Sequence, residues 1–181
     1  MGKYEYNTKK FPKNSLYIIE DMINVLNVDK DFLDIITRIN EKGNPVFSYH
    51  ELYEIKEGIE LNIPLKDIEK YIINSKDSSV YNASQLQEIF SGLETFATDT
   101  VDIYAKLNKN GNAIFDDRQM RALRMALEDT DILIEEVYEL AKLDANMIPI
   151  YDGDQIEELY LTTNKIPFKE VMSSIGILNK D

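Results

Sequence analysis

Residues 80–86 read Val-Tyr-Asn-Ala-Ser-Gln-Leu, and this pattern recurs three more times along the 181-residue chain. Its aromatic residue stands at Phe47, Tyr81, Phe115 and Tyr151, at intervals of 34, 34 and 36 residues. A residue that commonly caps helices follows each aromatic, and a Glu or Gln stands three residues further on. The pairs are Ser48 and Glu51, Asn82 and Gln85, Asp116 and Gln119, and Asp152 and Gln155. This is the sequence of a capping box with a hydrophobic staple, so it predicts helices that begin near the four caps.

A second, shorter helical pattern follows in each unit. Residues 63–68 match residues 166–171, each with a proline at the start, and the middle units carry Val101–Ala105 and Glu136–Ala141 at the same place. A degenerate fifth copy begins at Phe11, where Pro12 replaces the cap and the helix is expected from near Asn14. A period of this length is typical of stacked supersecondary units.

The sequence therefore predicts an all-α fold without strands: an α-solenoid of about five helical hairpins with a period of about 34 residues. We expect residues 1–181 to form a single helical-repeat domain whose units start near residues 11, 47, 81, 115 and 151. The handedness of the solenoid stays open. Small residues stand eleven positions after each aromatic, at Gly58, Gly92, Ala126 and Thr162, where we expect a neighbouring helix to come close.

The third unit resembles a helical repeat found in proteins of Firmicutes phages and mobile elements. That family has a "QM-x-E-I-R-x-G-L-E" helix followed by a "D-V-x-x-Y-A" helix. The corresponding segments here are Gln85-Leu86-Gln87-Glu88-Ile89-Phe90-Ser91-Gly92-Leu93-Glu94 and Val101-Asp102-Ile103-Tyr104-Ala105. The match is good in the unit from Tyr81, fair in those from Phe47 and Phe115, and weak in the terminal ones. The resemblance implies a small phage-type accessory protein. In size and acidity the chain is also similar to phage-encoded inhibitors of CRISPR nucleases.

The composition argues against an enzyme. The chain has no Cys and a single His, so it cannot assemble a thiolate site, a disulfide or a His-based metal cage. His50 falls in the first turn of a predicted helix, where a surface position is expected. The loop from Lys106 to Gly111 has Lys106 where a calcium loop needs a carboxylate. We expect no catalytic residue, no cofactor and no metal. No apolar run approaches the roughly 20 residues that span a bilayer, so we expect a protein of the bacterial host cytoplasm.

The charge is the strongest functional signal in the sequence. The formal net charge is −13, and residues 128–158 contain a single base, Lys142. The acidic residues that we expect to bind a partner are Glu128, Asp129, Asp131, Glu135, Glu136, Glu139, Asp152, Asp154, Glu157 and Glu158. Asp144 lies in the same stretch. One interpretation is a solvated face that keeps the protein in solution. The other is a negative surface that occupies a basic groove on a nucleic-acid-binding protein, with the solenoid as a stiff scaffold.

Residues 135, 136 and 139 are spaced to share one helix face, with Leu133, Val137 and Leu140 available for the core. Neutralising the three glutamates together is expected to slow association with such a partner. A basic patch is also predicted, because Arg118, Arg121 and Arg124 lie on one helix. Arg118 and Arg121 should point outward, and Arg124 should flank the core. Ordinary charge balance is one explanation, and contact with a phosphate or carboxylate is the other. Direct nucleic-acid binding through this patch would work against the net charge.

Three functions are compatible with the sequence. The first is a non-enzymatic inhibitor or modulator that binds a host protein, such as a CRISPR nuclease or another nucleic-acid-handling protein. The second is an interaction scaffold or dimerising adaptor with no link to nucleic acid. The third is a hydrolase with a carboxylate site, which the missing residue types disfavour. A homodimer is compatible with all three.

Overall fold

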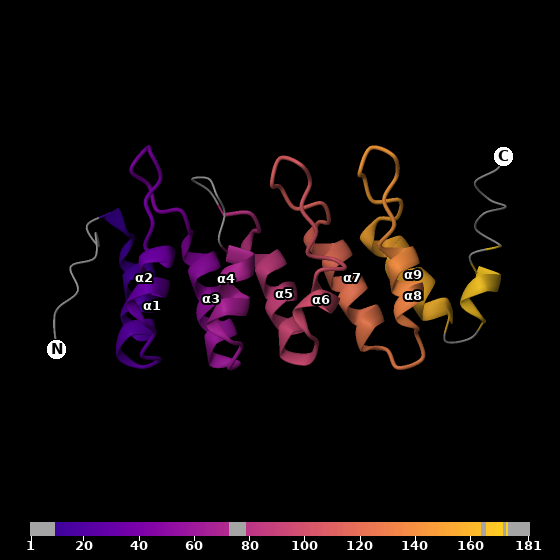
Figure 1. Cartoon of the computed structure of the whole chain (residues 1–181), viewed down its shortest axis with the longest axis horizontal. Coiled ribbons are helices and arrows are strands. Elements are labelled where there is room, and N and C mark those ends of the chain that lie inside the picture. The colour runs from indigo at the N-terminus through magenta and orange to yellow at the C-terminus, as the bar shows by residue number, and fades with distance from the viewer. Residues whose placement is uncertain (1–9, 73–78, 164–165, 172, 174–181) are drawn as a thin grey trace. The chain divides into compact units, whose positions relative to one another are not determined.

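The computed structural model describes residues 10–72, 79–163, 166–171 and 173, and the regular elements in these ranges are helices. They are α1 (Lys13–Asn24), α2 (Lys30–Ile36), α3 (Tyr49–Glu60), α4 (Leu65–Ile72), α5 (Ala83–Thr95), α6 (Thr98–Val101), α7 (Asp117–Glu128), α8 (Ile134–Leu140) and α9 (Gly153–Thr163), drawn in Figure 1. Residues 168–171 are also helical. Among the described residues only isolated β-bridges occur, without a strand. The predicted all-α class is confirmed.

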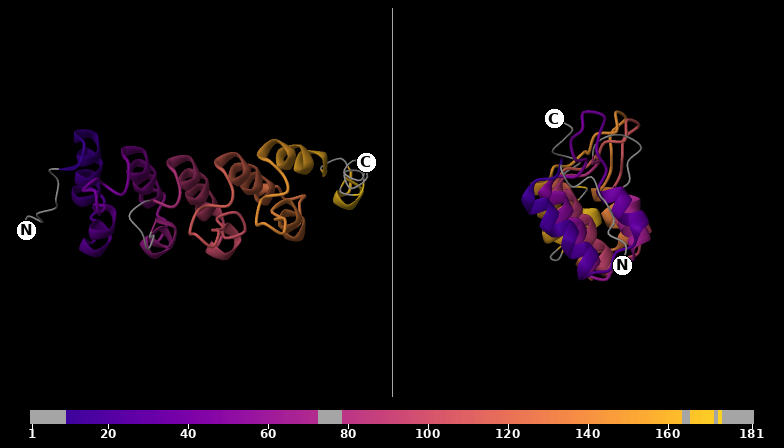
Figure 2. Two further views of the ribbon diagram at one scale, coloured as in Figure 1. Left: turned by 90° about the horizontal axis from the view of Figure 1, so that it is seen from above. Right: turned by 90° about the vertical axis from the view of Figure 1, so that its left-hand side faces the viewer.

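The chain divides into two compact units, Met1–Phe96 and Ala97–Asp181, here called unit 1 and unit 2. In unit 1, α3 packs against α1, α4 and α5. In unit 2, α7 packs against α8 and α9. Within each unit the first helices of the repeats form one layer and the second helices form another (Figure 2). The predicted pairing of α5 with α6 would join the two units, so it stays a prediction.

The four predicted capping boxes are present. Asn82 Oδ1 accepts a hydrogen bond from the backbone N of Gln85 at 2.9 Å, and Gln85 Oε1 accepts one from the backbone N of Asn82 at 2.9 Å. The same reciprocal bonds form in the boxes that begin at residues 48, 116 and 152. Helices α3, α5, α7 and α9 begin one residue after these caps. In the degenerate copy Pro12 makes no side-chain cap, and α1 begins one residue before the expected Asn14.

One capping box also links successive repeats. Gln119 Oε1 accepts from the backbone N of Asp116, while Gln119 Nε2 donates to the backbone O of Tyr151 at 2.7 Å. The chain comes close here, since a Cβ on Gly153 would lie 2.7 Å from Arg118 Cβ and 2.9 Å from the Arg118 carbonyl carbon. Gln119 is buried, and its side-chain amide is satisfied by one backbone donor and one backbone acceptor, as buried polar groups require.

The second helices bury two apolar positions of the same register. If the residue before each second helix is counted as zero, residues four and seven are buried in every repeat. They are Leu33 and Ile36, Ile68 and Tyr71, Val101 and Tyr104, and Val137 and Leu140. In the third repeat the predicted helix over Val101–Ala105 is instead the short α6 followed by turns. Leu133, expected in the core, is exposed, because it stands at the cap position of α8, and Ile132 is buried instead.

The loops that close the repeats share one design. Their chains bridge at Ile39–Pro45, Leu107–Ala113 and Leu143–Pro149. In each, an Asn or Asp side-chain oxygen accepts two backbone N–H groups, at Asn40, Asn108 and Asp144. One residue of each loop has a left-handed backbone conformation: Gly43, Gly111 and Met147, with φ of 78°, 80° and 64°. The equivalent loop of the second repeat lies largely outside the described residues. In unit 2 both loops project from the same end of the helices (Figure 1).

The small residues predicted between helices are buried at Gly58, Gly92 and Ala126, and Thr162 is half-buried. A Cβ on Gly58 would lie 3.1 Å from Phe90 Cδ2 on α5 and 3.5 Å from Ile68 Cδ1 on α4. Within the described ranges no helix is long and apolar enough to cross a membrane.

Replacing Asn82 with Ala should lower the free energy of unfolding by about 1 kcal/mol, because the backbone N of Gln85 loses its cap. Ser84→Ala, at an exposed position of the same first turn, should change it by less than about 0.5 kcal/mol. Chemical denaturation of both variants measures this. Equal effects of the two changes would contradict a role of the box in stability.

Gln119→Glu should retain the capping box but lose the bond to the Tyr151 carbonyl, since a carboxylate cannot donate. We expect a loss of about 1 kcal/mol in unfolding free energy at neutral pH. Gln155→Glu is the matched control, because Gln155 is exposed and its box bonds are only to Asp152. If both variants unfold at the same denaturant concentration, the link between repeats is not stabilising.

Gly58→Leu should destabilise unit 1 by about 1–3 kcal/mol, because the new side chain would overlap Phe90 and Ile68. Gly111→Ala tests a different cost, since nothing lies within 4 Å of that Cβ and only the φ of 80° opposes it. Thermal melts compare the variants. A neutral or stabilising Gly58→Leu would show that α3 and α5 are not closely packed at this point.

Candidate protein-binding surface

The acidic stretch predicted from the sequence lies in unit 2, but it does not form one helix face. Glu128 ends α7, Asp129 and Asp131 lie in the following loop, and the remaining acids are on or beside α8 and α9. Helices α8 and α9 belong to different layers of the unit (Figure 2). Acids that are adjacent in the sequence are therefore not all adjacent on the surface, because successive helices of a hairpin lie in opposite layers. The structure instead separates an α8 group from an α9 group.

Several of these acids have structural roles. Asp152 caps α9, Asp129 Oδ1 accepts from the backbone N of Asp131 at 2.9 Å, and Glu136 Oε2 accepts from the backbone N of Leu133 at 2.9 Å. Asp144 closes its loop, where the backbone N–H of Ile148 holds the pKa of its carboxyl below the ordinary value. Neutralising Glu136, as the sequence suggested, would thus weaken the start of α8 as well as remove charge.

Other acids are engaged by bases. Ion pairs of unit 2 join Arg118 to Asp154, Arg124 to Glu128 at 2.5 Å and Lys142 to Glu139 at 3.1 Å. The side chains of the Arg118–Asp154 and Lys142–Glu139 pairs are more than half exposed, so each of these two pairs contributes at most about 1 kcal/mol to stability. The pairs nevertheless reduce the charge that these acids present to a partner.

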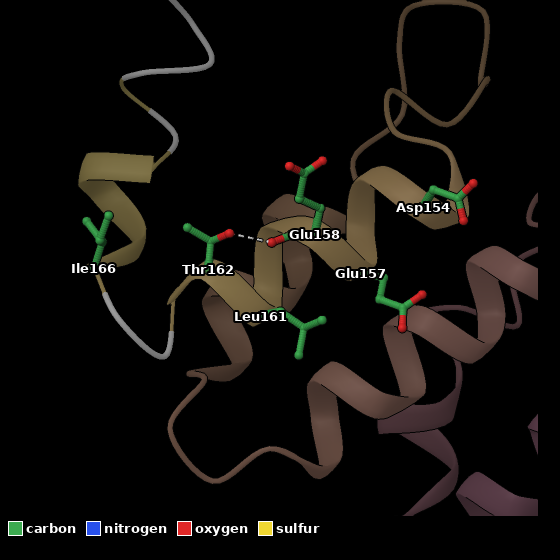
Figure 3. A pocket seen from close by; sticks show the side chains of 6 residues that line it. All are labelled: Asp154, Glu157, Glu158, Leu161, Thr162 and Ile166. Atoms are coloured by element: carbon green, nitrogen blue, oxygen red, sulfur yellow. Dashed lines mark hydrogen bonds between the residues drawn. The ribbon is translucent and has the colours of Figure 1, made fainter.

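Of the acids predicted to bind a partner, four are exposed and have neither a structural hydrogen bond nor an ion pair among the described residues: Asp131, Glu135, Glu157 and Glu158. Glu157 and Glu158 border an open groove along α9, which is also lined by Asp154, Leu161, Thr162 and Ile166 (Figure 3). Their side chains project from different sides of the helix (Figure 3). Such an open, carboxylate-lined surface is suited to a charged protein surface more than to a small molecule.

The basic patch has the predicted orientation. Arg118 and Arg121 are exposed and Arg124 is half-buried. Arg118 and Arg124 are each paired with an acid, and Arg121 makes no ion pair among the described residues. The patch is therefore mostly neutralised within its own unit, and it offers a phosphate one unpaired guanidinium.

The described residues also include one histidine and a groove in unit 1. His50 is exposed, and its ring meets the edge of the Tyr49 ring with a centroid distance of 5.1 Å. A groove in unit 1 runs between the first turns of α3 and α5, lined in part by the cap residues Ser48 and Asn82. Within the described ranges no group of three or more His, Asp or Glu side chains is placed to hold a metal ion.

The sequence reasoning missed three exposed apolar side chains beside the α8 acids: Leu133, Ile134 and Tyr138. A signal for them was present. In the same count, which starts from the residue before each second helix, residue five is acidic in the first three repeats: Asp34, Glu69 and Asp102. In the fourth repeat it is Tyr138. A comparison of the repeats at exposed positions, in addition to buried ones, would have identified this departure.

Comparison of the chain with protein-family models, with functionally characterised proteins and with solved structures finds no match.

Proposed function

We propose that the chain is a non-enzymatic inhibitor or modulator that binds a basic surface of a host protein through the acidic residues of unit 2. Residues 1–181 would form one α-solenoid of about five helical hairpins, which holds these residues on a stiff scaffold. The observation that carries the proposal is the set of four exposed, unpaired acids, Asp131, Glu135, Glu157 and Glu158. They have neither capping nor ion-pairing roles among the described residues, so a partner can use their charge.

The class of partner follows from electrostatics. A protein with a net charge of −13 is repelled by nucleic acid and attracted by the basic grooves that bind nucleic acid. Rim charges of this kind mainly raise the association rate and exclude wrong partners. A nucleic-acid-handling defence nuclease of a bacterial host, such as a CRISPR nuclease, has the required groove. The likeness in size and acidity to phage-encoded inhibitors of these nucleases supports the same partner and a cytoplasmic location.

A scaffold or dimerising adaptor without a link to nucleic acid is the second candidate. It is favoured by the loop between α8 and α9, where Met147, Ile148 and Ile150 are exposed. Exposed apolar side chains at a loop tip bind proteins without regard to charge. Salt dependence distinguishes the two candidates, because ionic strength screens charge pairs and leaves apolar contacts in place.

The test is affinity capture from a nuclease-treated bacterial lysate, with the captured proteins identified by mass spectrometry. The variant Glu135→Gln, Glu157→Gln, Glu158→Gln removes three unpaired acids of unit 2. The control Glu20→Gln, Glu41→Gln, Glu94→Gln makes the same change in net charge at exposed glutamates of unit 1. We expect the native chain and the control to capture basic nucleic-acid-binding proteins. The unit 2 variant should capture far less, and about 1 M salt, where the screening length is about 3 Å, should reduce capture by the native chain to the level of that variant.

A set of captured proteins that is unchanged in the unit 2 variant and persists in high salt would contradict the proposal and favour the adaptor. The pair Arg118→Ala, Arg121→Ala tests the remaining surface. If that pair abolishes capture while the acidic variant retains it, the basic patch is the contact surface.

A further inference from the structure

Three apolar side chains stand in solvent at the start of α8. The exposed fraction is 63% for Leu133, 43% for Ile134 and 51% for Tyr138. Ile134 and Tyr138 are four residues apart, so they are neighbours along one ridge of the helix. Leu133 precedes them at the cap, where its backbone N is held by Glu136. The patch therefore rests on an ordered element of the fold, with Ile134 and Tyr138 as neighbours on α8 and Leu133 directly before them in the chain.

The other second helices lack such a patch. At the position of Tyr138 the other three repeats have Asp34, Glu69 and Asp102. At the position of Leu133, directly before the second helix, they have Asp29, Pro64 and Ala97. The buried residues of α8, Val137 and Leu140, keep the common pattern. At the Leu133 and Tyr138 positions the repeat fold thus does not require apolar residues. Their exposure costs solubility, which a bound partner would offset.

Acids border the apolar ridge. Glu135 and Glu139 follow Ile134 and Tyr138 by one residue each, so they form a parallel ridge on the exposed side of α8. Asp131 lies two residues before Leu133 and is also exposed. Glu139 pairs with Lys142, whereas Asp131 and Glu135 are unpaired among the described residues. An apolar centre that contains a tyrosine and has a charged rim is the usual composition of a protein-protein contact.

We infer that Leu133, Ile134 and Tyr138 are the apolar centre of the partner contact, and that they bind a protein surface whose apolar side chains are flanked by Lys or Arg. The inference rests on the proposed function. It makes the start of α8 the part of unit 2 that loses its contact with water when the partner binds. Charge complementarity selects this occupant. A two-fold contact with a second copy would place the same carboxylates opposite each other, and a bare polycation would leave the apolar ridge in water.

Two synthetic peptides of equal positive charge serve as probes. One is an amphipathic helix of Leu and Lys with Leu on one face, and the other contains the same number of Lys with Ser in place of Leu. Each carries one Trp. The chain itself has no Trp, so tryptophan fluorescence arises from the peptide alone and reports its binding. The Lys–Ser peptide reads the contribution of charge, and the difference between the two peptides reads the apolar contact.

The patch variant is Leu133→Gln, Ile134→Gln, Tyr138→Gln. Its matched control is Leu61→Gln, Val25→Gln, Tyr17→Gln, which removes a Leu, a β-branched residue and a Tyr of unit 1 with exposed fractions of 40%, 66% and 58%. We expect the native chain and the control to bind the Leu–Lys peptide at least about tenfold more tightly than the Lys–Ser peptide, as desolvated anchor residues do. The patch variant should bind both peptides equally. Circular dichroism confirms that each variant keeps its helices.

The inference is overturned if the folded patch variant still prefers the Leu–Lys peptide as strongly as the native chain does, if the control loses this preference, or if the native chain has none. Failure of the proposed function gives a different result. In that case the Lys–Ser peptide would bind the native chain and the Glu135→Gln, Glu157→Gln, Glu158→Gln variant with the same affinity. Measuring the binding of the Lys–Ser peptide at increasing salt concentration also distinguishes failure of the inference from failure of the proposed function.

Discussion

The hydrogen bonds of the capping boxes are the constraint on which the rest of this structure depends. Each box fixes where a first helix begins, and with it which residues of that helix face its neighbours. In the box of α7 the same side chain does more, because Gln119 bonds to the backbone of its own cap and to the Tyr151 carbonyl of the following repeat. The start of one helix is thereby connected to the start of the next, and the close approach of Gly153 to Arg118 shows how little space remains between them.

Local determinants explain why much of the fold could be predicted from the sequence. A cap acts within four residues, so the starts of α3, α5, α7 and α9 follow directly from Ser48, Asn82, Asp116 and Asp152. The second helices are short and have weaker signals. In the third repeat the helix was predicted over Val101–Ala105, but the buried Ile103 and Tyr104 lie in the turns that follow α6. Leu133 was assigned to the core because its position in the loop before α8 has no periodicity to indicate its direction.

The candidate surface was harder to predict for two physical reasons. Charge counted along the chain does not reveal that α8 and α9 lie in different layers, nor that Glu136 and Asp144 are engaged by backbone N–H groups. Side chains at exposed positions also carry no helical signal of burial, so nothing in the sequence indicated that Ile134 and Tyr138 are exposed, and Leu133 was assigned to the core. A repeat fold allows such positions to change freely, since its stability comes from the buried register and the caps. Function can therefore differ between repeats that share one backbone.

The most direct measurement is hydrogen-deuterium exchange of the chain, free and bound to the proteins that it captures from a nuclease-treated lysate. The account predicts that binding slows exchange in residues 131–142, around α8, with a smaller effect along α9 and none in α3 or α4. Slower exchange confined to unit 1, for example at the first turns of α3 and α5 that line the groove there, would contradict it.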